Sequence, residues 1–124
     1  MEKNPGDSTY ETGRAGEEYA VAYLKGAGYE ILCRNYRYRR AEIDILALKG
    51  TCLVVVEVKT RSAGFYEALS DSVSRKKIAR LVKAADHFVR SRGLEVEVRF
   101  DIIQITGPPS DFRLTHWTGA FYFF

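Results

Sequence analysis

Charged residues stand at regular spacing in a segment that is otherwise almost entirely apolar. Glu42 and Asp44 lie in one run of branched residues, and Glu57 and Lys59 lie at the end of the next. Both runs are typical of strands, and Lys49-Gly50-Thr51 between them is typical of a tight turn. Charges in buried strands are costly unless they are paired or bind a cation. This predicted hairpin is therefore where we expect chemistry.

The register of the hairpin decides which side chains meet, because side chains alternate along a strand. With Gly50-Thr51 as the loop, Asp44 stands opposite Glu57 and Glu42 opposite Lys59. A two-residue loop one position earlier slips these pairs by two and keeps them on the same face. A three-residue loop would place the charged side chains of the two strands on opposite faces, since a one-residue slip moves every side chain of a strand to the other face.

The other face of the hairpin is predicted to be apolar throughout. On the first strand it contains Ile43, Ile45 and Ala47, and on the second Val54, Val56 and Val58. Strands with one wholly apolar face and one largely apolar face are typical of the centre of a sheet.

Two interpretations fit the charged end of the hairpin. Carboxylate oxygens are suitable ligands for a hard divalent cation such as Mg²⁺ or Mn²⁺. Lys59 would then orient a water or stabilise negative charge developing on a phosphate. The alternative is a cluster of salt bridges at the edge of the sheet.

The spacing of these residues resembles a known nuclease signature. Asp44 followed by Glu57-Val58-Lys59 resembles the PD-(D/E)xK pattern, in which neighbouring strands form a metal site. From Gly13 to Phe121 the chain is also similar to the YraN-like family of small bacterial proteins. The segments that carry this similarity are Gly13-Arg-Ala-Gly-Glu17, Asn35-Tyr-Arg37, Glu42-Ile-Asp44, Val56-Glu-Val-Lys-Thr-Arg61, Lys77 with Leu81 and Ala85, Arg99-Phe-Asp101 and Ala120-Phe121. One departure is Ala41, which stands where the family usually has glycine.

The resemblance implies roles for individual residues. Asp44 and Glu57 would bind Mg²⁺ or Mn²⁺, with Glu17 as a third or water-mediated ligand, and Lys59 would complete the catalytic set. Glu17 is also expected on the inward stripe of its helix. Its other interpretation is an ordinary first-turn acid that complements the helix dipole.

Helical and strand patterns alternate along the chain. A helix is expected from a capping box at Ser8 and Glu11 to about Lys25, and a second from residue 72 or 73 to Ser91, stopped by Gly93. Strands are expected at 29–38, in the hairpin, at 95–106 and at 112–116. A strand, a helix and a strand in succession imply a parallel crossover. The predicted fold is α/β with a restriction-endonuclease-like core, a mixed central sheet flanked by helices in the order αβββαβ.

Basic residues interleaved with tyrosines precede the hairpin. Arg37, Arg39 and Arg40 lie beside Tyr36 and Tyr38, a combination suited to a phosphate backbone or an unstacked base. The alternative is a solvated strand end whose arginines pair with nearby acids.

Further basic residues lie in the second helix and at the end of the hairpin. Arg61 and Lys77 are assigned to the nucleic-acid-binding set, Lys77 because it matches the family lysine. A basic ridge of Lys76, Arg80 and Lys83 is more typical of a solvated face. His87, beside apolar neighbours, is interpreted as structural. In the strand at 95–106, Asp101 is expected to form a structural ion pair with an arginine.

Length and composition limit the class of protein. With 124 residues, the chain is long enough for one domain with a core, expected at 9–124 after a disordered tail at 1–8. A net charge of +3 permits nucleic-acid binding without arguing for it. Two cysteines without a C-x-x-C pattern argue against a zinc site. There is no signal peptide and no apolar run long enough for a membrane span, so a cytoplasmic protein without a membrane partner is expected.

The sequence therefore predicts a metal-dependent endonuclease that hydrolyses DNA phosphodiester bonds. Branched or junction DNA is a substrate suggested by analogy of fold alone, and a homodimer would suit cutting of two strands. The alternative is a non-catalytic nucleic-acid-binding or adaptor module on the same fold.

Overall fold

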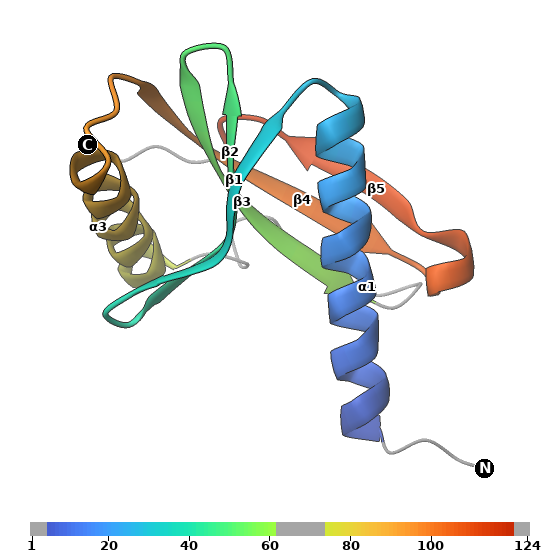
Figure 1. Cartoon of the computed structure of the whole chain (residues 1–124). Coiled ribbons are helices and arrows are strands. Elements are labelled where there is room, and N and C mark those ends of the chain that lie inside the picture. The colour runs from blue at the N-terminus through green and yellow to red at the C-terminus, as the bar shows by residue number, and fades with distance from the viewer. Residues whose placement is uncertain (1–4, 62–73, 121–124) are drawn as a thin grey trace.

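The computed structural model describes residues 5–61 and 74–120 (Figure 1). The elements follow in the order α1 (Pro5–Gly26), β1 (Glu30–Tyr38), β2 (Ala41–Lys49), β3 (Cys52–Arg61), α3 (Arg75–Ser91), β4 (Glu97–Thr106), a 3₁₀ turn (Pro109–Asp111) and β5 (Arg113–Trp117). Phe121 of the last family motif lies outside the described residues.

The strands form one mixed sheet in the order β1-β2-β3-β4-β5. β3 and β4 are parallel, and the other three pairs are antiparallel. The parallel pair needs a crossover, and α3 lies in that connection. The predicted fold class is confirmed: this is an α/β protein with a restriction-endonuclease-like core, to which β5 adds the further strand expected near the C-terminus.

The two long helices cover opposite faces of the sheet (Figure 1). On one face Leu81, Ala85 and Phe88 of α3 pack in a cluster with Leu53 and Val55 of β3. The other face is covered by α1. Its cluster contains Ala20, Val21, Leu24, Tyr29, Ile45, Ala47, Val54, Val56, Ile103 and Ile105. Each helix therefore buries the apolar stripe that its sequence presents.

The helix ends differ from expectation by a few residues. α1 begins at Pro5, before the capping box expected at Ser8, and ends at Gly26 as expected. α3 begins at Arg75 rather than at 72 or 73, because Ser74 caps it: the Ser74 hydroxyl accepts a hydrogen bond from the Lys77 amide at 3.1 Å.

The β2–β3 hairpin has the first of the expected registers. Lys49 pairs with Cys52, which leaves Gly50-Thr51 as the loop, and Gly50 takes the left-handed conformation with φ of 60°. This register runs as far as Ile45 opposite Val56, immediately before the acidic residues.

The expected alternation of β2 is wrong beyond this point. Ile43 packs in the α3-side cluster together with Leu46, whereas Ile45 packs on the α1 side. The alternation breaks at Asp44, opposite Asn35, which has a left-handed φ of 53° in β1. A backbone irregularity of this kind turns the strands and re-aims their side chains. The distal half of the β1–β2 hairpin accordingly bends toward α3 (Figure 1).

Candidate functional site

A pocket of about 630 Å³ opens where the beginning of β2, the end of β3 and the beginning of α3 meet. Its lining combines acidic and basic side chains drawn from three elements. It is lined by Arg40, Ala41, Glu42, Asp44, Glu57, Val58, Lys59, Ser74, Lys76, Lys77, Arg80 and Leu81. The predicted residues Asp44, Glu57 and Lys59 therefore share one pocket.

Glu57 is the most unusual residue of this pocket. Its side chain is 3% exposed; Oε2 pairs with Nζ of Lys77 at 3.2 Å, while the buried Oε1 has no hydrogen-bond partner in the described part of the chain. Burial, reinforced by the charge of Asp44, raises the pKa of Glu57 to about 7. A buried carboxylate oxygen without a donor is costly, so the site favours a proton or a cation there.

Asp44 is held at the irregularity of β2. Its Oδ2 accepts a hydrogen bond from the backbone N–H of Val58 at 2.8 Å. Burial raises the pKa of Asp44, and the charge of Glu17 adds to this, against the opposing hydrogen bond from Val58. The two strand carboxylates thus both resist ionisation as long as no cation lies between them.

Two lysines stand beside these carboxylates. Burial lowers the pKa of Lys59, and the adjacent Lys77 lowers it further. For Lys77, burial works in the same direction but is outweighed by Glu57 and other neighbours, so its pKa is raised. Lys59 is therefore the lysine of the two that gives up its proton more readily.

Glu17 borders the site from a second pocket of about 920 Å³, which also contains Glu42 and Asp44. Its Oε1 accepts hydrogen bonds from Arg34 at 3.1 Å and from Asn35 at 3.2 Å. In the described ranges, no three Asp, Glu, His or Cys side chains are grouped closely enough to hold a metal ion. Glu17 therefore lies near Asp44 without completing a cluster of three carboxylates.

A close helix–sheet contact places Glu17. A Cβ on the preceding residue, Gly16, would collide with the side chain of Thr60 in β3. Glycine at this position lets α1 approach the sheet. The second glycine of the Gly-x-x-Gly-Glu pattern therefore has a packing reason, whereas a Cβ on Gly13 would meet no described atom within 4 Å.

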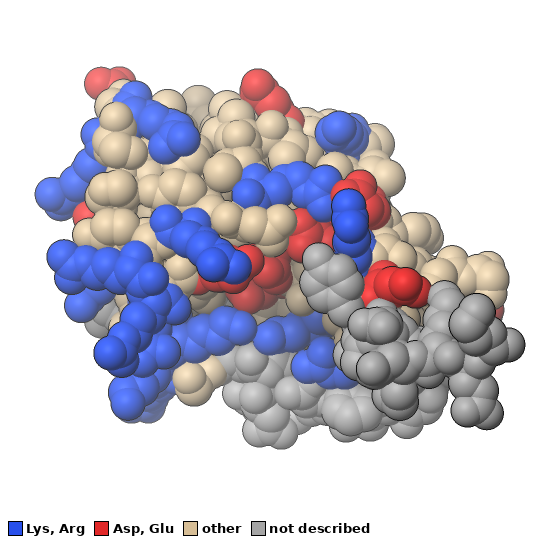
Figure 2. Space-filling model, turned by 60° about the horizontal axis from the view of Figure 1, so that its bottom comes forward, with Lys and Arg blue, Asp and Glu red and all other residues tan. Residues whose placement is uncertain are grey.

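The predicted nucleic-acid-binding residues are distributed around the site. Arg40 and Lys77 line the first pocket, and Arg37 lines the second, where it pairs with Glu42 at 3.5 Å. Arg39 lies over the ring of Tyr38, and Arg61 donates to the carbonyl oxygen of Thr60. Figure 2 shows Lys and Arg side chains on several sides of a central group of acidic side chains.

The sequence did not reveal some partners. It gave no sign that Lys77 pairs with Glu57, because these residues lie on separate elements and no local pattern links them. Glu42 was expected opposite Lys59 on one interpretation; it pairs with Arg37, its register partner in β1, as the alternative interpretation of the arginines expected. Ser74, Lys76 and Arg80 reach the pocket only because α3 begins beside it.

A five-stranded mixed sheet with a long helix on each face gives this chain the restriction-endonuclease-like architecture of an α/β protein. Residues 16–105 match a family described as "Uncharacterised protein family UPF0102", and the chain belongs to that family. This agrees with the YraN-like resemblance of its motifs.

Relatives match along nearly their whole length. A UPF0102 protein of Christiangramia forsetii is 47% identical over 114 residues, which are 92% of this chain and 96% of the relative. A UPF0102 protein of Bacteroides thetaiotaomicron is 46% identical over 112 residues, 90% of this chain and 93% of the relative. Among the described residues, no helix is both long and apolar enough to cross a membrane.

Proposed function

We propose that this chain is a metal-dependent endonuclease that hydrolyses phosphodiester bonds of DNA. The observation that carries the proposal is Glu57, buried beside Asp44 with one carboxylate oxygen unpartnered among the residues that the structure describes. A structural ion pair would satisfy both oxygens. A hard divalent cation would instead supply the missing partner for Oε1 and remove the repulsion between the two carboxylates.

The donor set suits Mg²⁺ or Mn²⁺. Asp44 and Glu57 offer carboxylate oxygens, with Glu17 as a third or water-mediated ligand. The bound cation would polarise the scissile phosphate and acidify a water. Lys77, which now holds Oε2 of Glu57, would be freed to contact a phosphate once the cation takes over the carboxylate charge.

Lys59 is the residue proposed to act on the attacking water. It lies in the same pocket, and its lowered pKa makes it better able to exchange a proton than an exposed lysine. In its charged form it would stabilise the negative charge that develops on the phosphate. Arg40 and Arg37 line the two pockets, and together with Arg39 and Arg61 they are proposed to hold the phosphate backbone.

Calorimetric titration with Mn²⁺ and Mg²⁺ tests the cation site. The wild type is expected to bind, and Asp44→Asn and Glu57→Gln are expected to lose binding. Glu97→Gln, which removes an exposed carboxylate at the start of β4, is the matched control and should bind as the wild type does. Absence of binding to the wild type would contradict the proposal and leave the charges as a salt-bridge cluster.

Cleavage is measured with the same proteins on single-stranded, duplex, flap and four-way-junction DNA. The wild type is expected to cut at least one of these, and the metal-site variants none. Lys59→Gln is expected to retain metal binding and to lose about 10²-fold or more in rate. Branched DNA and a homodimer for two-strand cutting stay predictions, which the flap and junction arms and a sedimentation measurement address.

The second candidate is a nucleic-acid-binding module without catalysis. The observation that favours it is the engagement of Glu17 by Arg34 and Asn35, which removes a third carboxylate from the pocket. This candidate predicts salt-dependent DNA binding that neither metal ions nor Glu57→Gln alter.

A further inference from the structure

The outward side of α3 carries basic residues that lead away from the pocket. Lys76, Arg80, Lys83 and His87 follow one another at intervals of four, three and four residues. Such intervals place side chains on one side of an α-helix. Lys76 and Arg80 also line the pocket that contains Glu57, so this stripe begins at the candidate centre. From Lys76 to His87 it extends about 16 Å along the helix.

The cations of the stripe have no acidic partner in the part of the chain that the structure describes. Arg90, the next basic residue after His87, pairs with Asp86 at 3.0 Å, so within the described residues the series of cations without an acidic partner consists of Lys76, Arg80 and Lys83. A row of unpaired cations is suited to the regularly spaced phosphates of a nucleic-acid strand.

His87 ends the stripe with a preformed aromatic stack. Its ring lies against Tyr38 at a centroid distance of 4.1 Å and an angle of 11°, and the guanidinium of Arg39 lies over the Tyr38 ring at 5.3 Å. The hydroxyl of Tyr36 hydrogen-bonds to Nδ1 of His87 at 2.7 Å and fixes the orientation of the ring.

This arrangement differs from the structural role expected of a histidine among apolar neighbours. The side chain of His87 is exposed although its orientation is fixed from two sides. A planar ring that is held in place and still faces water is prepared to stack on another planar group.

We propose that the stripe of Lys76, Arg80, Lys83 and His87 is a track for one unpaired strand of nucleic acid. Its phosphates would contact the three cations, and one base would stack on the exposed face of His87. A base in a duplex is already stacked on its neighbours, so the occupant is a single strand or a single-stranded extension of a duplex. This inference rests on the proposed function, because it names the substrate class of the same pocket.

Fluorescence anisotropy in EDTA tests the stacking part of the track. The probes are a labelled single-stranded oligonucleotide, the same strand with abasic sites, and a blunt duplex of equal length. The wild type is expected to bind the intact single strand most tightly. His87→Ala should weaken that binding about 5- to 100-fold with little change for the duplex, whereas His87→Phe, which keeps a planar ring, should retain the preference.

Salt titrations test the phosphate contacts. Lys76→Gln, Arg80→Gln and Lys83→Gln are each expected to lower the slope of log K against log salt concentration by about 0.7 for the single strand. Lys25→Gln removes an exposed charge from the last turn of α1, on the other face of the sheet, and should leave the slope unchanged. It is the matched control for loss of net charge.

Several results would overturn the track. Equal affinity for duplex and single strand would do so, as would undiminished binding of the abasic strand or an equal effect of Lys25→Gln and Lys83→Gln. Thermal unfolding monitors the fold of each variant, and His87→Phe keeps the test decisive should His87→Ala unfold.

The binding assay contains no metal, so its outcome is independent of the proposed nuclease activity. Cleavage without a preference for single strands would overturn only the track. Single-strand binding without metal binding would overturn only the nuclease.

Discussion

Two buried carboxylates on neighbouring strands of the same sheet have opposite surroundings. Glu57 of β3 faces α3, and Asp101 of β4 lies on the α1 side. Both are almost fully buried, at 2% and 0% exposure. Burial alone therefore does not distinguish them, and the difference lies in their partners.

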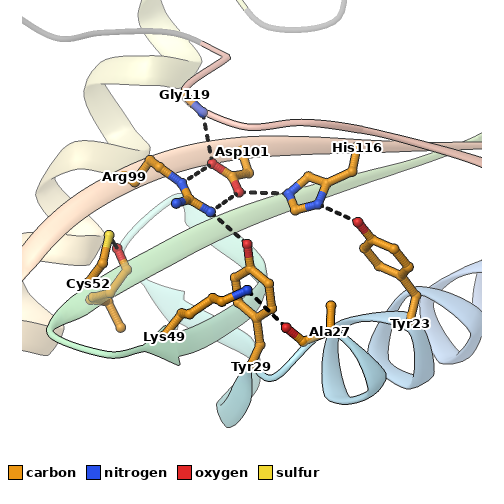
Figure 3. Close-up of polar contacts among 10 residues, drawn as sticks. Tyr23, Ala27, Tyr29, Lys49, Cys52, Arg99, Asp101, His116 and Gly119 are labelled. Atoms are coloured by element: carbon orange, nitrogen blue, oxygen red, sulfur yellow. Dashed lines mark hydrogen bonds and ion pairs between the residues drawn. The ribbon is translucent and has the colours of Figure 1, made fainter.

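Asp101 has a donor for each oxygen. Nε and Nη2 of Arg99 donate to its two oxygens at 2.9 Å, and Nε2 of His116 lies 2.7 Å from Oδ2. The backbone N–H of Gly119 donates to Oδ1. Nη2 of Arg99 also donates to the hydroxyl of Tyr29, and the hydroxyl of Tyr23 hydrogen-bonds to Nδ1 of His116 (Figure 3). Burial would raise the pKa of Asp101, but these hydrogen bonds outweigh it and the pKa is lowered.

The comparison separates a structural carboxylate from a candidate ligand. Both oxygens of Asp101 accept hydrogen bonds from described residues, and these bonds link β4 to β5 and to the segment that follows it. Glu57 has a raised pKa, and one of its oxygens has no hydrogen-bond donor within residues 5–61 and 74–120. Changes at the two sites should therefore affect stability in opposite directions.

The largest effect is expected from Asp101→Asn. Removing the charge leaves Arg99 without its partner in a buried network, at a cost of about 3–5 kcal/mol in the free energy of unfolding at pH 7. Urea denaturation measures it. Asp111→Asn, which breaks an exposed pair with Arg113 at 3.8 Å, should cost less than about 1 kcal/mol. Equal effects would refute the structural role assigned to Asp101.

The next effect concerns Glu57 and pH in the metal-free protein. Its pKa is raised from 4.5 to about 7 on folding, so the folded state holds a proton that the unfolded state releases between these values. Stability is therefore expected to fall as pH rises from about 4.5 to 7, by on the order of 3 kcal/mol, with Asp44 acting in the same direction.

Urea unfolding in EDTA at a series of pH values measures this fall. Glu57→Gln should flatten the profile, and Mn²⁺ at pH 8 should stabilise the wild type but not the variant. Asp101, whose pKa is lowered, works in the opposite sense: its contribution is lost only as the pH falls below about 3.8. A metal-free profile that rises between pH 4.5 and 7 would contradict the description of Glu57.

A smaller effect is expected at the contact between α1 and the sheet. Gly16→Ala places a methyl group against Thr60 and should destabilise by about 1–3 kcal/mol. Gly13→Ala, one turn earlier with open space around it, should instead stabilise by up to about 1 kcal/mol through helix propensity. Thermal unfolding measures the change in stability for each variant. A change of the same sign for Gly16→Ala and Gly13→Ala would exclude a tight contact at Gly16.

The smallest effect tests the rim of the Asp101 network. Tyr23→Phe removes the hydroxyl that lies 2.9 Å from Nδ1 of His116, at a cost of about 0.5–1.5 kcal/mol. Calorimetric unfolding measures this loss. A loss as large as that of Asp101→Asn would show that the phenol, rather than the buried carboxylate, organises the network.

Much of the fold could be predicted from the sequence because its signals are local. Alternating apolar residues marked the strands, and Gly50 and Gly93, both with positive φ, marked a turn and a helix end. The pairing of Asp101 with an arginine was also expected, and Arg99 is two residues away on the same strand. These features depend on neighbours within a few positions.

The candidate site was predicted in its parts but not in its arrangement. The spacing of Asp44, Glu57 and Lys59 placed them at one end of a hairpin, and they do share a pocket. The bend at Asp44 could not be predicted, because it depends on the left-handed conformation of Asn35 in another strand.

By itself, the sequence determined the order of elements, the position of the turn in the central hairpin and the residues that bring charge into the core. Only the tertiary structure decided which buried carboxylate is satisfied. Arg99, His116 and Gly119 converge on Asp101, while from the described part of the chain Glu57 receives only Lys77, on one oxygen. The physical reason is that hydrogen-bond satisfaction depends on donors from distant segments, which local propensity does not encode.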